Sequence, residues 1–184
     1  NEIQDKKLEY ITFVWANDFF NSDTIDKTTT GGTPQDTDVR WQKLFNVGVE
    51  MLVTAVSQLS AIAKVKTFYT PSNHDELTGY HALKYLEAWF RHDDNVEIDT
   101  SAMIRKYILY GKTLIGYTHG DKEKGQNGSK EKASKLASVM PLEAKDLWSK
   151  ANYYEMHTAH LHSEHAIHEI NGVIVRRISS PTAT

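Results

Sequence analysis

The alternation of two hydrophobic periods constrains the fold of this chain more than any other feature. Residues 8–16 are rich in Ile, Thr, Phe, Val and Trp, which predicts a buried strand. Residues 39–63 carry apolar side chains every three or four positions, as one face of a helix requires, and Asp38 is the predicted N-cap. The same order returns with a strand at 66–70 and a helix at 79–90. Helix after strand predicts an α/β chain in which helices cover the faces of a sheet.

The rest of the sequence predicts shorter strands and two further helical stretches. The strands are expected at 96–98, 106–110, 113–118 and 153–158. The helical stretches are expected around 133–139 and 142–150, with Pro141 in the first turn of the second. Asn171-Gly172 predicts a hairpin with a type I′ turn. We expect residues 1–184 to form a single domain.

Composition removes several functional classes. The chain has 184 residues and no cysteine, so disulfides, thiolate metal sites and cysteine nucleophiles are excluded, and a cytoplasmic location is expected. No apolar run approaches the roughly 18 residues that a membrane span needs, so no membrane association is expected. A net charge of −3 argues against a generic basic surface for coating nucleic acid. Histidine is the unusual residue type, because five of the nine lie between His157 and His168.

Reactive-looking side chains follow the predicted strands. They are Asp18, Asn73, His74, His119 and the pair His160 and His162. In α/β sheets, ligands gather at strand ends, on the loops, and the long polar loop 17–38 opens off such an end. Each residue also has an ordinary interpretation, as a turn or helix-cap residue or as a core histidine. Their shared position is what favours a site.

His160 and His162 form the strongest single signal. Alternate residues on an extended segment point the same way, so both imidazoles can face one site. Three further histidines lie close by in the sequence, and their spacing indicates no single metal geometry. We therefore predict that His157, His165 and His168 are surface or supporting residues.

The order of these blocks resembles the calcineurin-like metallophosphoesterases. In that family Asp-x-His is followed by Gly-Asp, Asn-His-Asp/Glu, a lone His and Gly-His-x-His. Here the later motifs correspond to Asn17-Asp18, Ser72-Asn73-His74-Asp75, His119 and Ala159-His160-Leu161-His162. The resemblance implies a metallophosphoesterase-type β-sandwich flanked by helices. The segment 19–38 is similar in style to phosphoesterases of bacteriophages and prophages.

The resemblance also implies a two-metal site that hydrolyses phosphate esters. Asp18 would bridge two divalent ions, with Asn73, His119 and His160 completing one site and His162 belonging to the other. We expect Mn²⁺, with Zn²⁺ or Fe as alternatives, because the ligand types select no metal strongly. His74 would stay free of metal and act on the phosphate as the catalytic residue. Asn21 stands where some relatives carry an orienting Asp, a role that Asp23 or Asp75 is predicted to take over.

The first family motif, Asp-x-His, does not occur before Asp18. We therefore expect a fragment, incomplete at its N-terminus and weak or inactive by itself, of a protein that hydrolyses phosphodiesters such as DNA. The preference for diesters comes from Asn21-Ser22-Asp23, which replaces the Asp-Arg-Gly of protein phosphatases. Two alternatives stay open: a non-catalytic metal- or partner-binding module with a degenerate site, and a histidine-rich sensor of pH or metal.

Overall fold

The computed structural model describes residues 8–16, 18–123, 130–160 and 166–178. These residues form eight strands and four helices in two compact units, Asn1–Ala102 and Met103–Thr184. Each unit has a sheet and a hydrophobic core of its own, and each is described separately below. The predicted α/β class is confirmed, whereas the organisation as a single domain stays a prediction.

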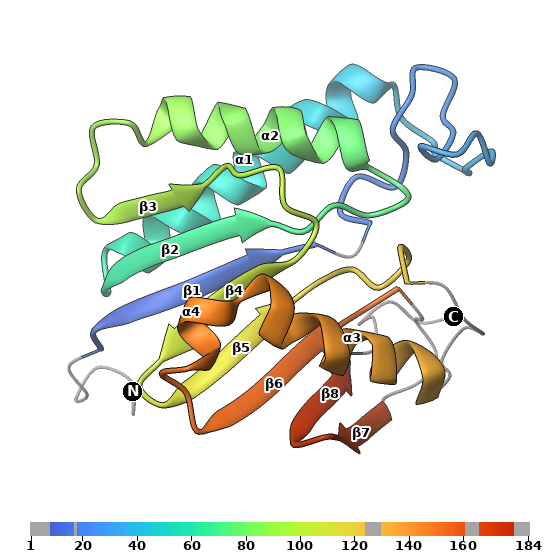
Figure 1. Cartoon of the computed structure of the whole chain (residues 1–184). Helices are drawn as coiled ribbons and strands as arrows, with labels where there is room; N and C mark the ends of the chain where they lie inside the picture. Colours follow the sequence, from blue (N-terminus) through green and yellow to red (C-terminus); the bar gives the residue numbers. More distant parts are fainter. Residues whose placement is uncertain (1–7, 17, 124–129, 161–165, 179–184) are drawn as a thin grey trace. The chain divides into compact units, whose positions relative to one another are not determined.

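Unit 1 is a parallel three-stranded sheet with two helices. The strands β1 (Tyr10–Trp15), β2 (Lys64–Tyr69) and β3 (Val96–Asp99) lie in the order β1-β2-β3. The connections contain α1 (Trp41–Ser60) and α2 (Glu76–Trp89). Because crossovers between parallel neighbours are right-handed, both helices belong on the same face of the sheet. Figure 1 shows α1 and α2 on that one side.

The core of unit 1 follows from two superposed periodicities. Alternate strand residues face the helices, and the register pairs Phe13 with Thr67 and Trp15 with Tyr69. The apolar stripes of the helices close over them, with Leu52 in α1 among the buried residues. The remaining buried members of this cluster are Phe20, Val49, Val56, Val65, Ala82, Leu83, Leu86 and Phe90.

Unit 2 is a mixed five-stranded sheet with the order β4-β5-β6-β8-β7. Its strands are β4 (Lys106–Tyr110), β5 (Thr113–Tyr117), β6 (Tyr153–Thr158), β7 (Ala166–Ile170) and β8 (Val173–Arg177). β5, β6 and β8 are parallel to one another, and the outer strands pair antiparallel through hairpins. The parallel pair β5 and β6 therefore ends at a single edge of the sheet.

Two helices cover one face of this sheet. They are α3 (Lys130–Glu143) and the short α4 (Lys145–Trp148), and Figure 1 shows α3 lying across the strands. Its buried residues Leu136 and Met140 join Leu114 and Met156 in the second core. At Gly116 a Cβ atom would lie 2.7 Å from the Met156 sulfur, so a larger residue would force the core side chains to move.

Details of helix ends and turns test the local predictions. The predicted cap Asp38 is wrong: Arg40 precedes α1, and among the described residues no side chain caps this helix. Pro141 lies inside α3 rather than at the start of a helix, because the last turn continues through a bond from the Ala144 amide to the Met140 carbonyl.

The Asn-Gly hairpin is confirmed. Asn171 and Gly172 have φ angles of 52° and 78°, as a type I′ turn requires, and they join β7 to β8. Within the described ranges, none of the helices combines the length and apolar character that crossing a membrane requires.

Candidate functional site

In unit 1 the candidate residues follow two neighbouring parallel strands. The Thr70 amide bonds the Trp15 carbonyl at 3.4 Å, so β1 and β2 end side by side. Asp18 comes just after β1, and Asn73 and His74 follow β2. Asp18 has a φ angle of 59°, in the left-handed region that non-glycine residues seldom adopt. Such strain concentrates at functional positions, and here it falls on a predicted ligand.

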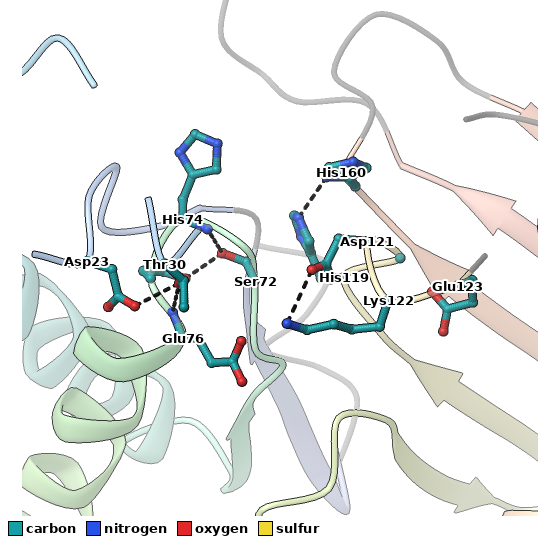
Figure 2. Close-up of polar contacts among 12 residues, drawn as sticks. Asp23, Thr30, Ser72, His74, Glu76, His119, Asp121, Lys122, Glu123 and His160 are labelled. Carbon is teal, nitrogen blue, oxygen red and sulfur yellow. Dashed lines mark hydrogen bonds and ion pairs between the residues drawn. The ribbon is translucent and has the colours of Figure 1, made fainter. Parts of the chain in front are cut away.

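His74 is oriented by the main chain. Its Nδ1 lies 3.1 Å from the carbonyl oxygen of Asn21, and because a carbonyl only accepts, Nδ1 carries the proton. The His74 amide donates to the Ser72 hydroxyl at 3.2 Å, which holds the backbone of the same turn, as Figure 2 shows. This arrangement fixes the ring and leaves Nε2 as the nitrogen that can act on a ligand.

Asp75 supports the turn from beneath. Its carboxylate is buried and accepts hydrogen bonds from the Tyr69 hydroxyl at 2.7 Å, the Ser72 hydroxyl at 2.5 Å and the Phe20 amide at 2.8 Å. Burial raises the pKa of Asp75, the three donors oppose that rise, and the nearby charge of Asp18 adds to it. The same burial also raises the pKa of Tyr69.

Asp23 caps helix α2 from the long loop. Its carboxylate accepts from the Thr78 amide at 2.7 Å and from the Leu77 amide at 3.1 Å. It also accepts from the Thr30 hydroxyl at 2.7 Å, a contact visible in Figure 2. These amides belong to the first turn of α2, where N–H groups lack partners within the helix. The carboxylate is therefore committed to the scaffold.

The partner predicted to orient His74 is thus corrected. Neither Asp23 nor Asp75 has its carboxylate on the imidazole, because backbone amides and hydroxyls hold both. The position Asn21 does orient His74, but through its backbone carbonyl. Every residue type has such a carbonyl, so no side-chain pattern in the sequence could have indicated it.

In unit 2 the candidate residues are two histidines at the end of β5 and β6. The parallel ladder continues past both strands, with bonds from the Thr118 amide to the His157 carbonyl and from the Ala159 amide to the His119 carbonyl. This extension brings His119 beside His160. His119 is fully buried, and His160 has a φ angle of 68°. Asp18 in unit 1 and His160 in unit 2, the two candidate residues with a left-handed backbone, therefore both follow strand ends.

The two imidazoles face each other. Nε2 of His119 and Nδ1 of His160 are 3.1 Å apart and share a hydrogen bond, which Figure 2 shows as a dashed line. Two nitrogens bound to one ion at about 2.1 Å, with an angle of about 90–110°, are about 3.0–3.4 Å apart. The distance between the two nitrogens therefore falls in the range for two ligands of one divalent cation, and binding of a cation by both would replace the hydrogen bond between them.

The predicted ligand set contains residues of both units. Within the described residues, no group of three or more His, Asp or Glu side chains is placed to hold a metal ion. His162 lies outside the described residues. The assignment of Asp18, Asn73, His119, His160 and His162 as metal ligands stays a prediction.

The neighbouring histidines differ from this pair. His157 lies in β6, with its Nε2 3.0 Å from a Glu155 oxygen and its ring edge-on to Tyr117. Glu155 is held in turn by Arg176, and this guanidinium lowers the pKa of the carboxyl group. These contacts tie the His157 ring to neighbouring strand residues and not to the histidine pair. His165 lies outside the described residues, and His168 is part of β7.

Comparisons with known proteins include a distant structural likeness. No family model and no curated protein matches the sequence. Among solved structures, the chain is similar to a double mutant of Vps29 from Entamoeba histolytica, with 18% identity and a TM-score of 0.37. The match covers 69% of this chain and 63% of the Vps29 chain, which is less than two thirds of its length. The similarity to phage-type phosphoesterases stays a prediction.

Proposed function

We propose that this chain carries the site of a metal-dependent phosphodiesterase. The observation that supports the proposal is the pair His119 and His160, whose facing nitrogens are 3.1 Å apart. Imidazole is a common ligand of divalent metals in proteins, and without cysteine the site suits Mn²⁺, Zn²⁺ or Fe. When bound, divalent ions supply an activated water and offset the charge of the phosphoryl oxygens.

We assign His74 as the general acid for the leaving group. Its Nδ1 proton is donated to the Asn21 carbonyl, so in the imidazolium form Nε2 carries a second proton. During hydrolysis, water adds to phosphorus, the bond from phosphorus to the leaving oxygen breaks, and Nε2 gives its proton to that oxygen. The products are a phosphomonoester and an alcohol. A backbone carbonyl holds the ring without adding a negative charge next to the phosphate.

The first test is metal binding to the purified chain. Calorimetric titration with Mn²⁺ and Zn²⁺ should show binding that falls at least about tenfold in His160→Ala, because the imidazole pair is broken. The matched control is His157→Ala, which removes a neighbouring histidine bound to Glu155 and should leave the affinity unchanged. Absence of metal binding, or equal losses in both variants, would favour a non-catalytic module.

A second test separates the chemistry from metal binding. His74→Ala should retain the metal affinity while lowering Mn²⁺-dependent cleavage of bis(p-nitrophenyl) phosphate by about 10²-fold or more. His92→Ala provides an exposed-histidine control in the same unit. Cleavage of p-nitrophenyl phosphate with no cleavage of the diester would overturn the preference for phosphodiesters.

A further inference from the structure

Unit 1 contains a pocket of about 330 Å³ between the long loop and the two helices. Pockets of a few hundred Å³ with mainly apolar walls and a few polar groups are typical of small-molecule sites. The residues that line this pocket are Phe20, Ser22, Asp23, Thr24, Ile25, Trp41, Leu44, Phe45, Leu77, Thr78 and His81.

The walls of the pocket expose aromatic and aliphatic surface to water. Phe20 and Phe45 form a stacked pair beneath it, with ring centroids 5.7 Å apart and planes inclined by 23°. Around the opening, Trp41, Ile25 and Leu77 have exposed fractions of 47%, 73% and 56%. Large exposed apolar side chains gathered around one concavity are typical of a binding site for an apolar group.

Polar groups in the lining suit the edge of a planar heterocycle. Ser22 and Thr78 contribute hydroxyl groups, and His81 contributes an imidazole. Hydroxyl and imidazole groups can donate to or accept from ring nitrogens and exocyclic groups. The one carboxylate, Asp23, is already bound to the first-turn amides of α2.

Cations and carboxylates both lie close to Trp41 in the sequence. Arg40 and Lys43 stand at the beginning of α1, Asp36 and Asp38 precede them, and all four residues are exposed. Nucleic-acid strands bind to surfaces where aromatic side chains stack on bases while neighbouring cations meet the backbone.

The pocket adjoins the turn that holds His74. Asn21, whose carbonyl orients the imidazole, lies between the pocket residues Phe20 and Ser22. We propose that the pocket binds one unpaired nucleobase of a strand whose neighbouring phosphate reaches His74. The position of the phosphate rests on the proposed function, whereas binding of the base does not. A base must leave its stack to enter, so the substrate is single-stranded or frayed at this nucleotide.

Calorimetric titration with deoxyadenosine monophosphate, without metal, tests the binding of a base. The affinity should fall about tenfold or more in Trp41→Ala, because stacking on the indole is lost, and should largely return in Trp41→Phe. The matched control is Trp89→Ala, an exposed tryptophan of α2 outside the pocket, which should leave the affinity unchanged. Deoxyribose 5-phosphate, which lacks a base, should bind at least tenfold more weakly than the nucleotide.

The outcomes of these titrations distinguish a failure of the pocket proposal from a failure of the proposed function. Nucleotide binding that depends on Trp41, in a protein that cleaves no diester, would leave the pocket proposal standing and overturn the proposed function. Equal affinity for deoxyribose 5-phosphate, or an unchanged affinity in Trp41→Ala, would overturn the pocket proposal whether or not diesters are cleaved. Binding of the apolar dye anilinonaphthalene sulfonate without nucleotide binding would also overturn it and mark a hydrophobic docking groove.

Discussion

The two units place polar residues after parallel strands in the same way, yet use them differently. In unit 1 the carboxylates of Asp23 and Asp75 are held by backbone amides and hydroxyls and stabilise the loops. In unit 2 the imidazoles of His119 and His160 face each other with a spacing that suits a metal ion. Position at a strand end therefore does not decide the role of a side chain; the nearest donors do.

The reason is the start of helix α2. The first amides of a helix have no acceptor within the helix, so a nearby carboxylate is drawn to them and becomes part of the scaffold. His119 and His160 instead follow β5 and β6, and the extended ladder between these strands sets them side by side. The two imidazoles are therefore held within hydrogen-bond distance of each other.

The largest expected effect tests the scaffold role of Asp23. Asp23→Ala removes the acceptor for the Leu77 and Thr78 amides and for the Thr30 hydroxyl, and should lower the free energy of unfolding by about 2–3 kcal/mol. Urea unfolding followed by circular dichroism measures it. Asp26→Ala, an exposed residue of the same loop, is the control and should change stability by less than about 0.5 kcal/mol.

A smaller effect on stability is expected when the histidine pair is broken. Asn tolerates a left-handed backbone, so His160→Asn should change the free energy of unfolding by less than about 1 kcal/mol. The same variant should lose metal affinity, as measured by titration with Mn²⁺. A loss of stability as large as that of Asp23→Ala would make the histidine pair structural and remove the contrast between the units.

The smallest expected effects concern pH, and their signs differ between the units. In unit 2 the Arg105 guanidinium, 2.5 Å from the Glu143 carboxylate, lowers the pKa of that group. A lowered pKa adds stability above the unfolded-state pKa of about 4.3, and this contribution is lost as pH falls. The cost of Glu143→Gln should therefore grow as pH rises from about 3 to 6, reaching less than about 1 kcal/mol because the pair is partly exposed.

In unit 1 the sign is opposite. Burial raises the pKa of Asp75, so its contribution is present below the unfolded-state pKa of about 3.9 and is lost as pH rises through the folded-state pKa. The stability of Asp75→Asn relative to the native chain should therefore improve as pH rises. Urea unfolding at a series of pH values compares the two variants. If the stability of Glu143→Gln and of Asp75→Asn, each relative to the native chain, changed with pH in the same direction, the opposite pKa shifts assigned to the two carboxyl groups would be wrong.

Much of the local structure could be predicted from the sequence. The strands before Asp18 and Asn73, the helix that follows each strand and the turn at Asn171-Gly172 all follow from periodicity and turn chemistry. The position of the candidate residues at strand ends follows too, because it depends only on where each strand stops. The predicted cap Asp38 failed, since the side chain that caps a helix depends on the geometry with which the chain enters it.

The partners of the candidate residues were decided by the tertiary structure. Asp23 reaches amides 54 and 55 positions away, and His74 bonds a carbonyl 53 positions away. The pocket likewise gathers the loop residue Phe20, Trp41 in α1 and Leu77 in α2.

The sequence by itself determined which segments become strands and helices, because those choices depend on neighbours within a few residues. Only the tertiary structure decided which carboxylate caps a helix, which carbonyl orients His74 and which histidines meet. The physical reason is that hydrogen bonds and stacking act over a few ångströms, so a role is assigned only when distant segments have packed together.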